Sequence, residues 1–139
     1  MSDGPTTRIA LLLVAGGGFL GTLARYAIVE VMPAPSGWPF VTLLVNLVGA
    51  FALGLLIQGV ASGNTDSPRR RALRLLAGTG FLGSFTTYSA FAVETERLLA
   101  EGLAGIAAGY VAASLLGGLA ACVGGVVIAA RWRTQRIDA

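Results

Sequence analysis

Long uncharged stretches dominate the chain and are separated by short polar segments. They cover residues 9–24, 31–65, 75–93 and 102–130. A helix needs about 20 mostly apolar residues to cross a bilayer. The first stretch reaches that length only if its helix continues past Arg25, and the prolines between residues 33 and 39 mark a turn before the second helix. The pattern predicts four transmembrane helices, at about residues 8–31, 39–61, 72–100 and 103–131.

The third predicted helix is interrupted at membrane depth. Three glycines, Gly78, Gly80 and Gly83, are followed by a run of hydroxyl side chains: Ser84, Thr86, Thr87, Tyr88 and Ser89. In lipid, broken backbone is tolerated only where protein or a water-filled cavity satisfies the freed polar groups. We therefore expect a break near residues 80–85, and such a break indicates an ion or substrate site.

Composition supports one small membrane domain over residues 1–139. The chain is 55% hydrophobic and only 12% charged, with a mean hydropathy of +0.75, whereas a soluble domain is about a quarter charged. Four helices form a bundle too thin to enclose a pore alone, so we expect an oligomer. Small residues spaced four apart allow helices to approach closely, either between subunits or within one. They are Gly17 with Gly21, Gly105 with Gly109, and Gly117 with Ala121 and Gly125.

All ten basic residues are arginines, and they are distributed unequally. With four spans, the N-terminus, the loop between the second and third helices, and the C-terminus share one face. That face carries Arg8, Arg69, Arg70, Arg71, Arg74, Arg131, Arg133 and Arg136. The positive-inside rule makes this face cytoplasmic and predicts a multi-pass protein of the inner (plasma) membrane. Short arginine clusters beside membrane helices are common, so we expect no nucleic-acid partner.

The titratable residues argue for passive permeation rather than enzymatic or proton-coupled chemistry. The chain has no histidine. Four glutamates, Glu30, Glu94, Glu96 and Glu101, lie near predicted helix ends, where we interpret them as solvated or interfacial charges. A small drug–proton antiporter, the main alternative, needs an ionisable group inside the membrane.

Two helices carry polar residues spaced four apart, which places each pair on one helix face. These are Thr42 and Asn46 on the second helix, and Tyr110 and Ser114 on the fourth. Neutral donors and electropositive ring edges suit a small anion that sheds its water. Arg25 would raise the local anion concentration. Three alternatives remain open: an interhelical hydrogen bond for Asn46, an interfacial position for Tyr110, and snorkelling for Arg25.

Three segments carry a family resemblance. Residues 16–26 (GGGFLGTLARY), 42–51 (TLLVNLVGAF) and 80–91 (GFLGSFTTYSAF), the last followed by Glu94, resemble the first three helices of the Fluc (CrcB) fluoride channels in order and spacing. The resemblance implies a passive, fluoride-selective channel that exports cytoplasmic fluoride and so relieves its toxicity. It also implies an antiparallel dimer with two pores, embedded in membrane lipid.

Carried over by position, the resemblance assigns roles to individual residues. The fluoride pore would comprise Thr42, Asn46, Tyr88, Phe91, Tyr110 and Ser114, with Arg25 in the vestibule. The backbone carbonyls of Gly83 and Thr86 would hold a structural Na⁺. Tyr88 stands where phenylalanine is usual. The arginine asymmetry leaves open a homodimer, a heterodimer with an oppositely oriented homologue, or a non-conducting subunit of a heteromeric channel.

Overall fold

The computed structural model describes residues 7–32, 37–61 and 67–137. Three helices are long and apolar enough to cross a membrane: α1 (Thr7–Val31), α2 (Phe40–Ala61) and α6 (Ala104–Ile137). The chain is therefore an all-α membrane protein, as predicted. Residues 33–36 of the turn predicted between residues 33 and 39, and residues 62–66 before the third pass, lie outside the described residues.

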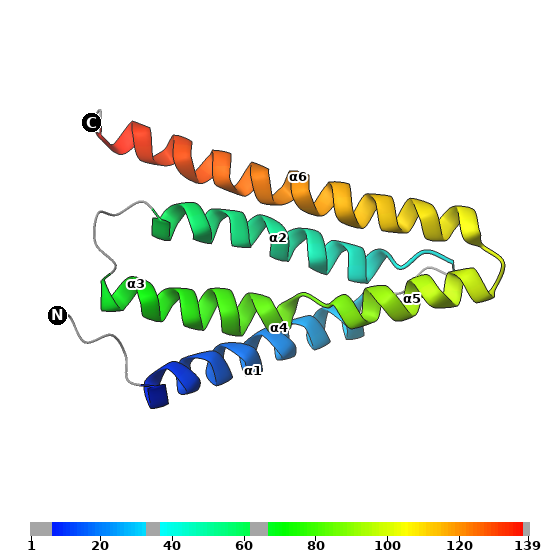
Figure 1. The fold of residues 1–139 in the computed structure, drawn as a ribbon, viewed down its shortest axis with the longest axis horizontal. Coiled ribbons are helices and arrows are strands. Elements are labelled where there is room, and N and C mark those ends of the chain that lie inside the picture. Colours follow the sequence, from blue (N-terminus) through cyan, green and yellow to red (C-terminus); the bar gives the residue numbers. More distant parts are fainter. Residues whose placement is uncertain (1–6, 33–36, 62–66, 138–139) are drawn as a thin grey trace.

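The third pass along the chain, which we call the broken pass, runs beside α2 and consists of several segments joined end to end (Figure 1). They are α3 (Pro68–Leu73), the π-helix η1 (Arg74–Leu82), the single turn α4 (Gly83–Phe85) and α5 (Tyr88–Ala100). Within the bundle, α2 packs against α6, and α1 packs against η1 and α4. The two ends of the chain lie at the same end of the bundle, where α3 begins.

The third pass begins at Pro68, four residues before the predicted start. The hydroxyl of Ser67 accepts a hydrogen bond from the Arg70 backbone N–H, and Pro68 occupies the first helical position. Both are favourable helix-start features, because Ser satisfies a free N–H and Pro has none to leave unpaired. Arg69, Arg70 and Arg71 were predicted to belong to the linker before the third helix, but they lie in the first turns of that helix.

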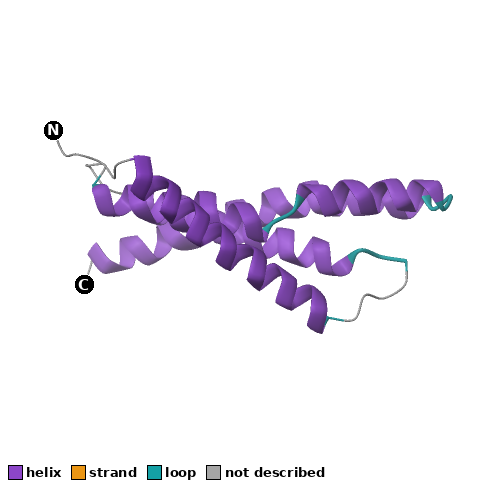
Figure 2. Ribbon diagram, turned by 90° about the horizontal axis from the view of Figure 1, so that it is seen from below, coloured by secondary structure: helices purple, strands orange, loops and turns teal. Residues whose placement is uncertain are grey.

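The break falls at Thr86 and Thr87, after the predicted interval of 80–85. Thr86 ends the preceding turn because its N–H and its hydroxyl both donate to the Leu82 carbonyl oxygen, at 3.0 and 2.9 Å. Thr87 begins α5, since its hydroxyl accepts the Ala90 N–H at 3.1 Å. The glycines lie within helix, so threonine side chains position the break, which Figure 2 shows as a loop between two helical segments.

Glycines let the helices of a single chain approach closely. A Cβ added at Gly17 or Gly21 would collide with the backbone of η1, and one at Gly125 would collide with the α2 backbone. These small residues thus pack within one subunit. Gly105 has no atom within 4 Å of an added Cβ and contributes to no such contact here.

Large apolar side chains remain exposed along the long helices. Leu12 of α1 is 72% exposed and Leu119 of α6 is 66% exposed. The buried cluster is small and lies between α5 and α6, where Leu98, Ala107 and Tyr110 pack together. Large apolar side chains therefore make up much of the outer surface of the described residues.

Candidate functional site

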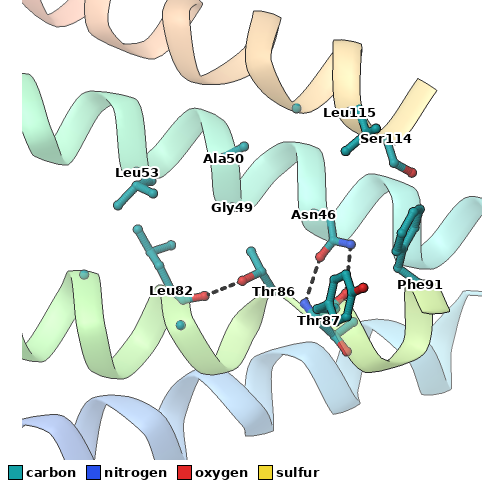
Figure 3. A pocket seen from close by; sticks show the side chains of 14 residues that line it. Asn46, Gly49, Ala50, Leu53, Leu82, Thr86, Thr87, Phe91, Ser114 and Leu115 are labelled. Carbon is teal, nitrogen blue, oxygen red and sulfur yellow. Dashed lines mark hydrogen bonds between the residues drawn. The ribbon is translucent and has the colours of Figure 1, made fainter. Parts of the chain in front are cut away.

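A pocket of about 440 Å³ lies beside the break, between α2, the broken pass and α6 (Figure 3). Its walls are largely apolar, with leucines and glycines from all three passes. The polar or aromatic side chains that line it are Asn46, Thr86, Thr87, Tyr88, Phe91 and Ser114. Four of the predicted pore residues therefore border one cavity: Asn46, Tyr88, Phe91 and Ser114.

Asn46 of α2 makes two hydrogen bonds to the backbone of Thr87, one of the two residues at the break. Its Nδ2 donates to the Thr87 carbonyl oxygen at 3.1 Å, and its Oδ1 accepts the Thr87 N–H at 2.8 Å. Both bonds are drawn in Figure 3. Thr87 is the N-cap of α5 and has an extended backbone, so its N–H has no helical acceptor. Asn46 Oδ1 satisfies that N–H, and Nδ2 gives the Thr87 carbonyl an additional donor from α2. In this structure the Asn46 side chain therefore makes an interhelical hydrogen bond, one of the alternatives that the sequence left open.

Ser114 contributes a hydroxyl that no other described residue uses. Its Oγ is shielded from solvent and, among the described residues, has no hydrogen-bond partner. Buried polar atoms are nearly always paired, so this hydroxyl is a candidate donor for a ligand, which it could reach once the Ser114 side chain rotates toward the cavity. Phe91 lines the same cavity, and the edge of an aromatic ring is electropositive.

Thr42 and Tyr110 lie outside the pocket lining and meet at Glu94 instead. The Thr42 hydroxyl donates to Glu94 Oε1 and the Tyr110 hydroxyl to Oε2, both at 2.7 Å. Tyr110 is fully buried and Glu94 is half-buried. The interpretation of Glu94 as a solvated or interfacial charge was therefore wrong. Its position in the middle of α5, three residues after Phe91 and on the same face, was the available signal.

Aromatic rings connect the pocket with this Glu94 cluster. The ring centroid of Phe91 lies 6.0 Å from that of Tyr88 and 5.3 Å from that of Tyr110. Trp38 packs edge-on against the other side of Tyr110, at 6.1 Å. Tyr88, Phe91 and Tyr110 thus form a continuous row. Tyr88 is 81% exposed although it lines the pocket, so the chain leaves this side open.

Arg25 lies at the break rather than in the pocket wall. Its Nε donates to the Ser84 carbonyl oxygen at 3.2 Å, so α1 is tied to α4 by a guanidinium–carbonyl bond. Arg25 is half-buried. The vestibule role predicted for it remains a prediction.

Backbone carbonyls at the break have lost their usual helical donors. In an α-helix the N–H of Thr87 would bond to Gly83 and that of Ala90 to Thr86. Here Thr87 N–H donates to Asn46 and Ala90 N–H donates to the Thr87 hydroxyl. Among the described residues, no three His, Cys, Asp or Glu side chains gather as a metal site. A cation at the break would thus be held by carbonyl oxygens.

Comparison with known proteins identifies the family. The profile of the family described as "CrcB-like protein, Camphor Resistance (CrcB)" matches residues 12–126. The chain belongs to the CrcB family. The matched region contains α2, the broken pass and every residue of the pocket. The resemblance drawn from the three motifs is confirmed.

Several CrcB relatives match over nearly their whole length. The chain is 43% identical over 121 residues to "Fluoride-specific ion channel FluC 2" of Leifsonia xyli, covering 87% of this chain and 83% of that protein. It is 43% identical over 124 residues to "Fluoride-specific ion channel FluC" of Chlorobaculum tepidum, covering 88% and 96%. The protein of the same name from Chlorobium phaeobacteroides is 40% identical over 129 residues, covering 92% and 98%. All three names describe channels rather than enzymes.

Proposed function

We propose that this CrcB protein is a passive, fluoride-selective channel that lets fluoride leave the cytoplasm across the plasma membrane. Relatives about 40% identical over most of the chain are named as fluoride-specific ion channels. The pocket combines neutral donors, aromatic edges and an apolar wall. Such a lining suits a small anion, because fixed cations in a dry path would hold the anion too tightly to release it.

The observation that carries the proposal is the buried hydroxyl of Ser114, which has no partner among the described residues and belongs to a pocket wall that also contains Phe91. Fluoride accepts hydrogen bonds strongly. One bond from Ser114 and one edge contact with Phe91 would replace part of its hydration shell. Neither group would have to abandon another partner, since Ser114 has none among the described residues.

The test is fluoride efflux from liposomes that contain the purified chain. Ser114→Ala should reduce the initial fluoride efflux rate by about tenfold, roughly the value of one hydrogen bond to a charged group. Ser84→Ala is the matched control, because Ser84 is half-buried in the broken pass but does not line the pocket. It should conduct normally. Equal rates in the two variants would remove Ser114 from the pathway.

We further propose that two subunits in opposite orientations complete the pore. Two observations support this: the pocket is open at Tyr88, and the apolar side chains of Leu53 and Leu115 in its lining are exposed. The arginine asymmetry favours one orientation per chain, so the partner is either a homologous subunit that inserts the other way or a second copy that overrides the charge rule. The same asymmetry keeps a non-conducting role in a heteromer as the alternative.

For the break we propose a structural Na⁺, bound by the carbonyls of Gly83 and Thr86 from each subunit. The diversion of the Thr87 and Ala90 N–H groups supports this set of ligands. Neutral oxygens suit a hard monovalent cation, whereas a divalent ion would recruit carboxylates. Replacing Na⁺ by a large organic cation should shift the protein from dimer to monomer. A dimer equally stable without Na⁺ would contradict the site.

A further inference from the structure

The arginine-rich end of the bundle has no evident role in conduction. We infer that it is a binding surface for the phosphate headgroups of anionic phospholipids, whichever ion the chain conducts. Figure 1 places the start of α1, the start of α3 and the end of α6 at this end. We call it the arginine end; it carries Arg8, Arg69, Arg70, Arg71, Arg74, Arg131, Arg133 and Arg136.

Charge separates the two ends of the molecule. The arginine end holds eight arginines. Three aspartates are close to these arginines in the sequence, and the three aspartates lie outside the described residues. The rest of the molecule contains two arginines, Arg25 beside the break and Arg97 near the end of α5, and all four glutamates. One of those arginines donates to the Ser84 carbonyl and the other pairs with Glu101 at 2.9 Å. Positive charge is therefore concentrated at the arginine end.

The arginines are also accessible at the depth where headgroups lie. Arg8, Arg69, Arg71 and Arg131 are exposed, and each stands within a few residues of an apolar membrane-crossing segment. Arg70 Nη1 is shielded from solvent and has no hydrogen-bond partner among the described residues. Guanidinium groups bind phosphate through charge-assisted, often bidentate, hydrogen bonds. A soluble polyanion would match the charge but not the adjoining apolar helix faces, which favour a lipid.

The two tryptophans of the chain provide a reporter at each end. Trp132 follows Arg131 and is 63% exposed, whereas Trp38 packs against Tyr110 at the other end of the bundle. Trp38→Phe leaves Trp132 as the only tryptophan, and Trp132→Phe leaves Trp38. Each variant is placed in phosphatidylcholine vesicles that contain a minor fraction of phosphatidylglycerol. Either lipid is supplied with brominated acyl chains, which quench tryptophan on contact.

For each tryptophan, quenching by brominated phosphatidylglycerol is divided by quenching by brominated phosphatidylcholine. This ratio measures the local enrichment of phosphatidylglycerol, and it does not depend on how exposed the tryptophan is. We expect a ratio of roughly five or more at Trp132, the enrichment that one interfacial arginine supplies, and a ratio near one at Trp38. Equal ratios at the two tryptophans would overturn the proposal.

Matched substitutions then assign the enrichment to the arginines. In the Trp38→Phe background, Arg131→Gln with Arg133→Gln should lower the Trp132 ratio severalfold, whereas Arg97→Gln at the opposite end should leave it unchanged. Should the double variant fail to fold, raising the salt from about 0.1 to about 1 M tests the same point on unsubstituted arginines. The Debye length then shrinks from about 10 to about 3 Å, and the ratio should fall toward one. A ratio insensitive to both the substitutions and salt would refute the proposal. So would displacement of the lipid by single-stranded RNA at equal phosphate concentration, which would assign the surface to a soluble polyanion.

Discussion

Glu94 and Asn46 show how the polar residues divide their roles. Glu94 lies in the broken pass and Asn46 lies in α2 beside it, and protein groups occupy both side chains. Two hydroxyls donate to Glu94, and Asn46 bonds to both backbone groups of Thr87. They hold the walls of the pocket in place. Ser114, in contrast, keeps its hydroxyl available among the described residues.

Asn46→Ala should both destabilise the protein and abolish fluoride flux. Removing the amide leaves the N–H of Thr87 without its partner, at a cost of about 1–3 kcal/mol. The midpoint of thermal unfolding in detergent should fall by several degrees. Asn46→Asp keeps the oxygen that accepts the Thr87 N–H, so it should lie between the wild type and the alanine variant. Unchanged melting and flux in Asn46→Ala would contradict this role.

Tyr110 should depend on Glu94 for its contribution to stability. Its hydroxyl donates to a carboxylate, and such charge-assisted bonds are about twice as strong as neutral ones. Tyr110→Phe should therefore cost about 1–2 kcal/mol in the wild type and clearly less in a Glu94→Gln background. Thermal unfolding of the four proteins gives the coupling. Tyr26→Phe, on an exposed tyrosine, is the control and should be neutral. An equal cost in both backgrounds would exclude the coupling.

Residue type revealed which side chains carry chemistry, but not which would meet. Thr42, Asn46, Tyr110 and Ser114 stood out as polar residues on apolar helices. That two of them meet a glutamate of another pass depends on how the three helices align along the bundle. Glu94 was interpreted as a solvated or interfacial charge because it lies near a predicted helix end. Its position along its own helix does not reveal which side chains of α2 and α6 pack against it.

Among the elements, the pairing of α1 with η1 rests on glycine. Gly21→Ala should force the two helices apart, because the added Cβ meets the Phe81 backbone, which cannot rotate away. Gly16→Ala is the matched control in the same helix, where an added Cβ has no atom within 4 Å. We expect lost fluoride flux and a lower melting point only for Gly21→Ala. Similar behaviour of both variants would argue against this packing.

Element types were more predictable than element ends. Hydrophobic runs indicated the three long helices, because about 20 apolar residues have few other uses. The break was expected at the glycines, yet it lies at Thr86 and Thr87, where two hydroxyls and the Asn46 amide replace backbone partners. Only the Asn46 bond depends on a neighbouring helix. The two threonine bonds are local, so the helix-start signal at Thr87 could have placed the break more closely than the glycines did.

For the whole molecule, the arginine asymmetry predicts one orientation, with both termini in the cytoplasm. Two cysteine substitutions in a Cys122→Ala chain test this in intact cells. Gly63→Cys, in the loop after α2, should be protected from an impermeant thiol reagent. Glu101→Cys, in the turn between α5 and α6, should react. Equal labelling at the two positions would show that the chain inserts both ways, which would favour a homodimer over a heterodimer.

Fluoride efflux from liposomes that contain only the purified chain tests the proposed function most directly. The liposomes are loaded with equal fluoride and chloride, the internal and external pH are the same, and an ionophore for the counter-cation dissipates the electrical potential. We predict rapid fluoride efflux with chloride retained. A proton gradient should be unnecessary, because no coupled proton site is required for passive flow. Retention of both anions would contradict a channel that works without a different partner subunit, equal release of both would contradict fluoride selectivity, and flux that appears only with a proton gradient would indicate an antiporter that uses Glu94.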